Sequence, residues 1–231
     1  MKLLAVETST RNFSLAVLSG DKVIRQRNKT VDRILSSAII PAIKDILSES
    51  GLTLQGIDGF AVGLGPGSFT SLRVGLSTVK ALAYATGKPI VGIPSLDVLA
   101  MNDGTGDTKS ICALHDARRG MVYACLYEKK EDVVRKTGDY QLTTVGELLK
   151  SIKGKTLFLG DGIRLFRQEI EDYHVRHRSQ LTPVFAKEKD WYPHARHLVW
   201  LARERFQKGK FDRLDRLVPL YLYEADCQVQ R

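Results

Sequence analysis

The feature that most limits the fold of this chain is a glycine-rich turn between an expected strand and an expected helix. Residues 63–75 read GLGPGSFTSLRVG, with the strand at 59–64 and the helix at 69–85. Gly65 and Gly67 allow another group to approach the backbone closely, and Ser68 is placed to cap the helix. Because helix N-termini attract anions, the turn is either phosphate-facing or a structural corner.

A second polar turn follows the first expected strand, at 2–7. It contains Glu7, Thr8, Ser9 and Thr10. A phosphate loop of a phosphotransferase needs an acidic residue to organise magnesium and a glycine whose backbone can reach the phosphate. Glu7 supplies the acid, but no glycine is present. A polar hairpin turn is therefore the favoured interpretation, and phosphate contact by Thr8, Ser9 and Thr10 is the alternative.

The order of expected elements repeats along the chain. The first set has strands at 2–7, 13–18 and 22–27, a helix at 32–50, a strand at 57–64 and a helix at 69–85. The second set has strands at 110–115, 122–128 and 133–141, a helix at 144–151, a strand at 156–160 and a helix at 163–170. This repetition predicts an α/β protein with two related βββαβα halves, as in the actin/hexokinase/Hsp70-like superfamily, where nucleotide lies between the halves.

The boundary between the halves is expected in the small, polar segment 102–107. We predict an N-terminal lobe at 1–103 and a smaller C-terminal lobe at 104–231. The helix expected at 194–206 can pack back on the first lobe. The helix at 69–85 is apolar on two faces, which indicates either deep burial or a partner.

Charge, histidines and cysteines narrow the function classes. Net charge is +9, and residues 196–216 hold seven Lys/Arg against three acids; either a solvated face or an RNA contact explains them.

The histidine pairs His174/His177 and His194/His197 have i, i+3 spacing, and HxxxH and HExxH are absent, so no metal site is expected. Three cysteines without CxxC spacing and no leader pattern at the N-terminus indicate reduced thiols in the cytoplasm.

Four motifs together resemble the TsaB (YeaZ) family. They are LAVETS at 4–9, GPGSFTSLRVG at 65–75, DARRGMVY at 116–123 and PLYL at 219–222. The resemblance is most specific in residues 1–125 and weak from about 130 to 215. It implies a subunit of the machinery that makes N6-threonylcarbamoyladenosine at position 37 of tRNAs reading codons that begin with A. It also implies pairing with a TsaD-type catalytic paralogue and a TsaE-type ATPase, and a homodimer when the chain is alone.

In that family the two helices matching 32–50 and 69–85 form the dimer surface. The expected partner contacts are Leu35, Ile39, Ile43, Phe69, Leu72, Arg73, Leu76 and Val79. Two positions depart from the family pattern: Leu35-Ser36 stands where many members have His-Ser, and Ser71 replaces a glycine. Which of the apolar residues face the core and which the partner stays open at this stage.

The resemblance implies a non-catalytic scaffold with no cofactor or metal of its own, ATP and metal being handled by partner subunits. The paralogue's His-x-x-x-His metal pair is missing, and no nucleophile–base motif is present, which argues against peptidase chemistry. Two alternatives remain: a small ATPase or phosphotransferase of the actin-like superfamily, and a direct tRNA-binding module using residues 196–216.

Overall fold

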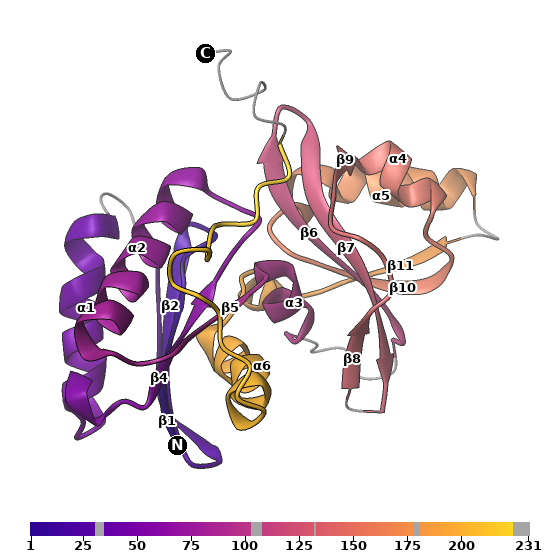
Figure 1. Cartoon of the computed structure of the whole chain (residues 1–231). Helices are drawn as coiled ribbons and strands as arrows, with labels where there is room; N and C mark the ends of the chain where they lie inside the picture. The colour runs from indigo at the N-terminus through magenta and orange to yellow at the C-terminus, as the bar shows by residue number, and fades with distance from the viewer. Residues whose placement is uncertain (31–34, 103–107, 132, 178–180, 224–231) are drawn as a thin grey trace. The chain divides into compact units, whose positions relative to one another are not determined.

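The computed structural model describes residues 1–30, 35–102, 108–131, 133–177 and 181–223 (Figure 1). The chain forms two compact units: unit 1 comprises residues 1–98 and 193–220, and unit 2 comprises 99–192 and 221–231. The boundary expected at 103/104 lies outside the described residues. Residues 193–220 fall within the lobe predicted at 104–231 but belong to unit 1, which is the alternative given for the helix at 194–206.

Unit 1 is built on a mixed sheet of five strands in the order β3-β2-β1-β4-β5. Strands β1 to β3 are antiparallel neighbours, whereas β4 and β5 run parallel to β1. The strands are β1 Lys2–Glu7, β2 Asn12–Ser19, β3 Lys22–Thr30, β4 Gly59–Gly63 and β5 Ile90–Ile93. The helices are α1 Leu35–Glu49, η1 Leu54–Gly56, α2 Phe69–Thr86 and α6 Ala195–Gln207, and α3 Ser95–Ala100 contains the division between the two units. The expected start of the first helix at Asp32 lies outside the described residues.

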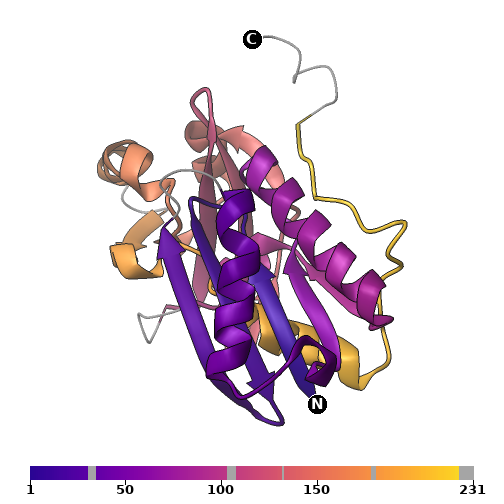
Figure 2. The same ribbon diagram turned by 90° about the vertical axis from the view of Figure 1, so that its left-hand side faces the viewer.

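Helices cover both faces of this sheet. Leu4 and Val6 of β1 pack in one cluster with α1 and α2, and Leu3 and Ala5 pack in another with α6. Figures 1 and 2 show α1 and α2 on one side of the sheet and α6 on the other. Central strands buried on both faces need continuous apolar runs, which explains the sequence of β1. Residues 193–220 return to unit 1 because α6 supplies its second layer.

Unit 2 repeats the plan with a six-stranded sheet in the order β11-β10-β6-β7-β8, and β9 also pairs with β7. Its strands are β6 Ser110–Arg118, β7 Met121–Lys130, β8 Val133–Lys136, β9 Gln141–Thr144, β10 Gly154–Leu159 and β11 Leu181–Phe185. Its helices are α4 Val145–Lys150, α5 Ile163–Arg176 and η2 Glu188–Asp190. The single strand expected at 133–141 is wrong: it is two strands that pair with opposite ends of β7.

The two units therefore share an order of antiparallel strands, helix, strand, helix and one more parallel strand, with three strands before the first helix in unit 1 and four in unit 2. Unit 2 has its own core, in which Leu114 and Val122 meet Leu148 of α4 and Ile170 of α5. In the part of the chain that the structure describes, no helix has the length and hydrophobicity that a membrane span requires.

Candidate partner surface and buried turns

The polar turn after β1 is buried and closed by hydrogen bonds. Glu7 is fully buried, and its Oε1 accepts a hydrogen bond from the Ser9 backbone N–H at 2.7 Å. Its Oε2 accepts from the Ser95 hydroxyl at 2.9 Å. Ser95 Oγ in turn accepts from the Gly65 N–H at 3.0 Å, and the Ser95 N–H donates to the Gly65 carbonyl at 2.7 Å. One carboxyl group thus connects both polar turns to the start of α3.

The two turns that the sequence offered as phosphate-facing pack against each other. The Ser68 N–H donates to the Ser9 carbonyl at 2.7 Å, and a Cβ on Gly67 would overlap that same carbonyl. Thr8, Ser9 and Thr10 are buried, and a Cβ on Gly75 would overlap Thr8. Close packing of Ser9 backbone against Gly67 and of the Thr8 side chain against Gly75 accounts for both glycines without a ligand, which favours the structural corner.

Ser68 does not cap α2 as expected. Its hydroxyl forms no capping hydrogen bond, and it bonds instead to the Ser71 hydroxyl at 3.0 Å. Ser71 is the residue that stands in place of the family's glycine, so this departure has a local consequence. Ser68 is exposed at the start of α2.

Most of the expected partner contacts are wrong, because the side chains lie in the core of unit 1. They are Leu35, Ile39, Ile43, Leu72, Leu76 and Val79, each at most 8% exposed. Their helical spacing is that of the stripe facing the sheet, and such a stripe is not available to a partner. Phe69 and Arg73 remain exposed, with the Arg73 guanidinium 3.7 Å from the centroid of the Phe69 ring.

Two exposed apolar residues of the same two helices were not among the predicted contacts. Ile40 of α1 is 51% exposed and Tyr84 of α2 is 82% exposed. Phe69, Arg73, Ser77, Ala81 and Tyr84 recur at about one helical turn, so they form one stripe, which we call the α2 stripe. The apolar second face of the helix was visible in the sequence, but only the sheet decides which face is outward.

His115 of β6 is buried and pairs with Asp161, a partly exposed residue just before α5. His115 is 2% exposed, and its Nδ1 lies 2.9 Å from Asp161 Oδ1, an oxygen that also accepts from the Asp116 N–H at 3.1 Å. The turn that follows holds Arg118, Arg119 and Gly120 at positive φ. Arg118 and Arg119 are exposed in this hairpin between β6 and β7.

Neither the histidine pairs nor the basic stretch forms an obvious site. Among the residues that the structure describes, no group of three or more His, Cys, Asp or Glu could hold a metal ion. Four of the seven basic residues in 196–216 are paired with acids: Arg203 with Asp21, Arg205 with Asp212, Lys208 with Glu204 and Arg213 with Asp215. This pairing favours a solvated face over an RNA contact for the stretch as a whole.

Comparisons with known proteins agree with one another. The family model for TsaD, tRNA N6-adenosine threonylcarbamoyltransferase, matches residues 28–230. The chain is 33% identical over 175 residues to the tRNA threonylcarbamoyladenosine biosynthesis protein TsaB of Bacillus subtilis, covering 74% of this chain and 76% of that protein. It is 28% identical to its Escherichia coli counterpart over 96% of this chain and 94% of that one. The solved structure of YeaZ from Pseudomonas aeruginosa is 26% identical, with a TM-score of 0.78 over 96% of this chain and 99% of that chain.

Proposed function

The chain belongs to the TsaB (YeaZ) family of tRNA threonylcarbamoyladenosine biosynthesis proteins, and we propose that it acts there as a non-catalytic subunit. Its task is to hold a TsaD-type paralogue through helices α1 and α2. The single observation that carries this proposal is the α2 stripe, together with the exposed Ile40 on the neighbouring helix α1. These exposed residues lie on the helix pair that the family uses for pairing.

The chemistry of the α2 stripe suits a helix–helix contact. Tyr84 and Phe69 are aromatic anchors at its two ends, and Arg73 is of the type enriched at interface hot spots. Ser77 and Ala81 between them are small, so a partner helix can approach closely there. Tyr84 alone exposes 82% of its area, which favours a surface that is covered in the working complex.

The chain has no cofactor of its own in this proposal, and its partners supply the chemistry. ATP and a metal are handled by the TsaD-type and TsaE-type subunits, tRNA is the substrate of the complex, and the chain alone forms a homodimer through the same surface. The buried, mutually packed turns at Glu7–Thr10 and Gly65–Ser68 support the absence of nucleotide chemistry in this chain. The free, buried thiols of Cys112 and Cys125 suit a cytoplasmic location.

The test mixes the purified chain with the TsaD-type paralogue of its own genome and measures mass by size exclusion with light scattering. We expect a stable complex for the natural chain, and at least about tenfold weaker association for Tyr84→Glu and Ile40→Asp. Leu165→Glu is the matched control, because Leu165 is 59% exposed on α5 of unit 2. Association that is unaffected by both α1–α2 variants would refute the proposed surface.

The same preparations separate the alternatives. Phosphate release from ATP by the isolated chain, above a buffer blank, would support a small ATPase. Binding of tRNA by the isolated chain, weakening steeply with salt as backbone contacts do, would support a direct tRNA-binding module. The scaffold proposal expects neither.

A further inference from the structure

The two edge strands of the unit 1 sheet, β5 and β3, differ in whether another part of the chain covers their outer backbone groups. The outer edge of β5 is covered by the chain itself: the Asp212 N–H donates to the Ile90 carbonyl at 2.9 Å, and the Gly92 N–H donates to Asp212 Oδ2 at 2.8 Å. At the other edge, β3 pairs with β2, and no further strand joins it within the described ranges. An open edge presents a row of backbone donors and acceptors that can template another strand.

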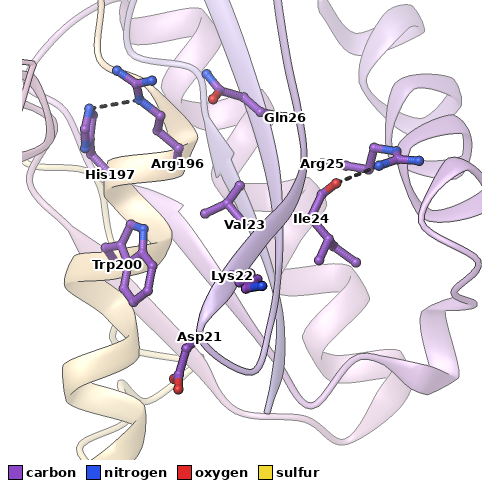
Figure 3. Close-up of a pocket in the computed structure, with 9 residues that line it drawn as sticks. All are labelled: Asp21, Lys22, Val23, Ile24, Arg25, Gln26, Arg196, His197 and Trp200. Carbon is purple, nitrogen blue, oxygen red and sulfur yellow. Dashed lines mark hydrogen bonds between the residues drawn. The ribbon is translucent and has the colours of Figure 1, made fainter.

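A groove runs beside that open edge, between β3 and α6 (Figure 3). Its volume is about 750 Å³. Val23 projects from β3 toward α6, and Trp200 and His197 of α6 line the other wall of the groove (Figure 3). Ile24 and Arg25 lie on the side of β3 that faces away from α6 (Figure 3). Trp200 is 37% exposed. The groove therefore offers apolar surface to alternate side chains of an added strand.

The charge around the groove is positive and largely unpaired. No acidic residue occurs in β3, which reads KVIRQRNKT. The one acid lining the groove, Asp21, is paired with Arg203. Among the residues that the structure describes, no ion pair engages Lys22, Arg25 or Arg196. These three cations flank the open edge without a counter-charge.

We propose that β3 binds an extended, acidic segment of a partner protein by strand addition. The backbone of the segment pairs with the edge of β3, and one set of its side chains enters the groove against Val23 and Trp200. Its carboxylates lie beside Lys22 and Arg196 at the groove and beside Arg25 on the far side of the strand. Main-chain hydrogen bonds supply affinity in this mode, and pockets for alternate side chains supply specificity. This site is separate from the α2 stripe and does not depend on the proposed function.

The same observations disfavour other occupants. Pairing of β3 with β3 of a second copy would bring two basic strands together, and charges on an edge strand deter such self-association. RNA would be attracted by the cations, but it cannot continue the sheet by pairing with the backbone donors and acceptors of β3 as a peptide strand does. An acidic extended peptide uses the edge, the groove and the charge together.

The test measures backbone hydrogen exchange of the intact chain with a short acetylated peptide of alternating glutamate and valine as the probe. We expect the probe to slow exchange in residues 22–30, and the matched lysine–valine peptide to have no effect. Arg196→Glu and Trp200→Ala should each weaken binding of the probe by about tenfold. Lys153→Glu, an exposed lysine of unit 2, is the control and should bind as the natural chain does.

Three results would overturn the proposal. The first is unchanged exchange in residues 22–30 with the glutamate–valine peptide. The second is equal protection by both peptides, which would remove the charge argument. The third is protection of this strand by single-stranded oligouridylate and by neither peptide, which would make the groove a nucleic-acid site.

Discussion

The Ser95 hydroxyl donates a hydrogen bond to Glu7 Oε2 at 2.9 Å while accepting one from the Gly65 N–H at 3.0 Å. Both side chains are fully buried. Ser95 therefore links a carboxyl group at the end of β1 to the glycine-rich turn before α2. A buried carboxyl is costly unless its oxygens are hydrogen-bonded, so this link fixes the relative positions of the two turns.

Removing that hydroxyl should destabilise unit 1. Ser95→Ala leaves Glu7 Oε2 without this donor and the Gly65 N–H without its acceptor. We expect the free energy of unfolding to fall by about 2–3 kcal/mol, the cost of leaving buried polar groups unpaired. Urea denaturation measures it. Ser48→Ala, on the exposed side of α1, is the control and should be nearly neutral; equal effects of the two variants would contradict the prediction.

Gly75 and Thr8 should show strong energetic coupling. In an open helix position Gly→Ala stabilises by about 1 kcal/mol, but a Cβ on Gly75 would overlap the Thr8 side chain. We expect Gly75→Ala to lose about 2 kcal/mol, as overpacked cores do. Thr8→Ala removes the overlapping Oγ1 and Cγ2 atoms, so the double variant should recover most of that loss. A double-mutant cycle measures the coupling, and additive effects would show that the contact is unimportant.

The sequence predicted the repeated order of elements and the strand–turn–helix at 59–85 because apolar periodicity and glycine are local signals. It could not predict that Ser95 is the partner of Glu7, since the two residues are 88 positions apart. Nor could it separate core from surface on α2, because both faces are apolar and only the sheet decides which one is inward. The sequence predicted one strand at 133–141 in place of β8 and β9, because both strands are short and both pair with β7.

Ile39 and Ile40 are adjacent in α1, but truncating them should change the free energy of unfolding by very different amounts. Ile39 is 1% exposed in the core, and Ile40 is 51% exposed. Ile39→Ala should lower the free energy of unfolding by about 3 kcal/mol, because it removes buried methyl groups and leaves a cavity. Ile40→Ala should change it by less than about 0.5 kcal/mol. Chemical denaturation of both variants checks this, and a similar loss for Ile40→Ala would place that residue in the core.

Asp212 should contribute far more to stability than the nearby Asp215. Asp212 accepts from the Gly92 N–H at 2.8 Å and from both terminal nitrogens of Arg205, at 3.0 and 2.8 Å, so it fastens the chain over β5. Asp212→Ala should cost about 2 kcal/mol, as charged hydrogen bonds do, and should speed hydrogen exchange in β5. Asp215 forms an exposed pair with Arg213, so Asp215→Ala should be nearly neutral. Equal unfolding free energies for the two variants would mean that the contacts of Asp212 with Gly92 and Arg205 do not stabilise the protein.

His197 should make the chain sensitive to mild acid. Burial of the ring, with the nearby charges of Arg196 and His194, lowers the pKa of His197 from 6.5 to about 4. Between these two values the unfolded chain binds a proton that the folded chain does not, so stability falls as pH decreases through this window. The contribution is fully present above the unfolded pKa. We expect it to amount to about 1–2 kcal/mol between about pH 7.5 and about pH 5, because the ring is partly exposed.

Comparison with His197→Gln isolates this contribution from the carboxyl groups that titrate nearby. Glutamine keeps an acceptor for the Arg196 Nε–H, which now lies 3.1 Å from His197 Nε2, but it cannot take up a proton. The variant should therefore show a flatter dependence of unfolding free energy on pH between about 7.5 and about 5. His177→Gln, at an exposed histidine of unit 2, should keep the natural slope. If His197→Gln also keeps it, the acid sensitivity must originate elsewhere, because a neutral side chain at this position removes the only proton that this argument invokes.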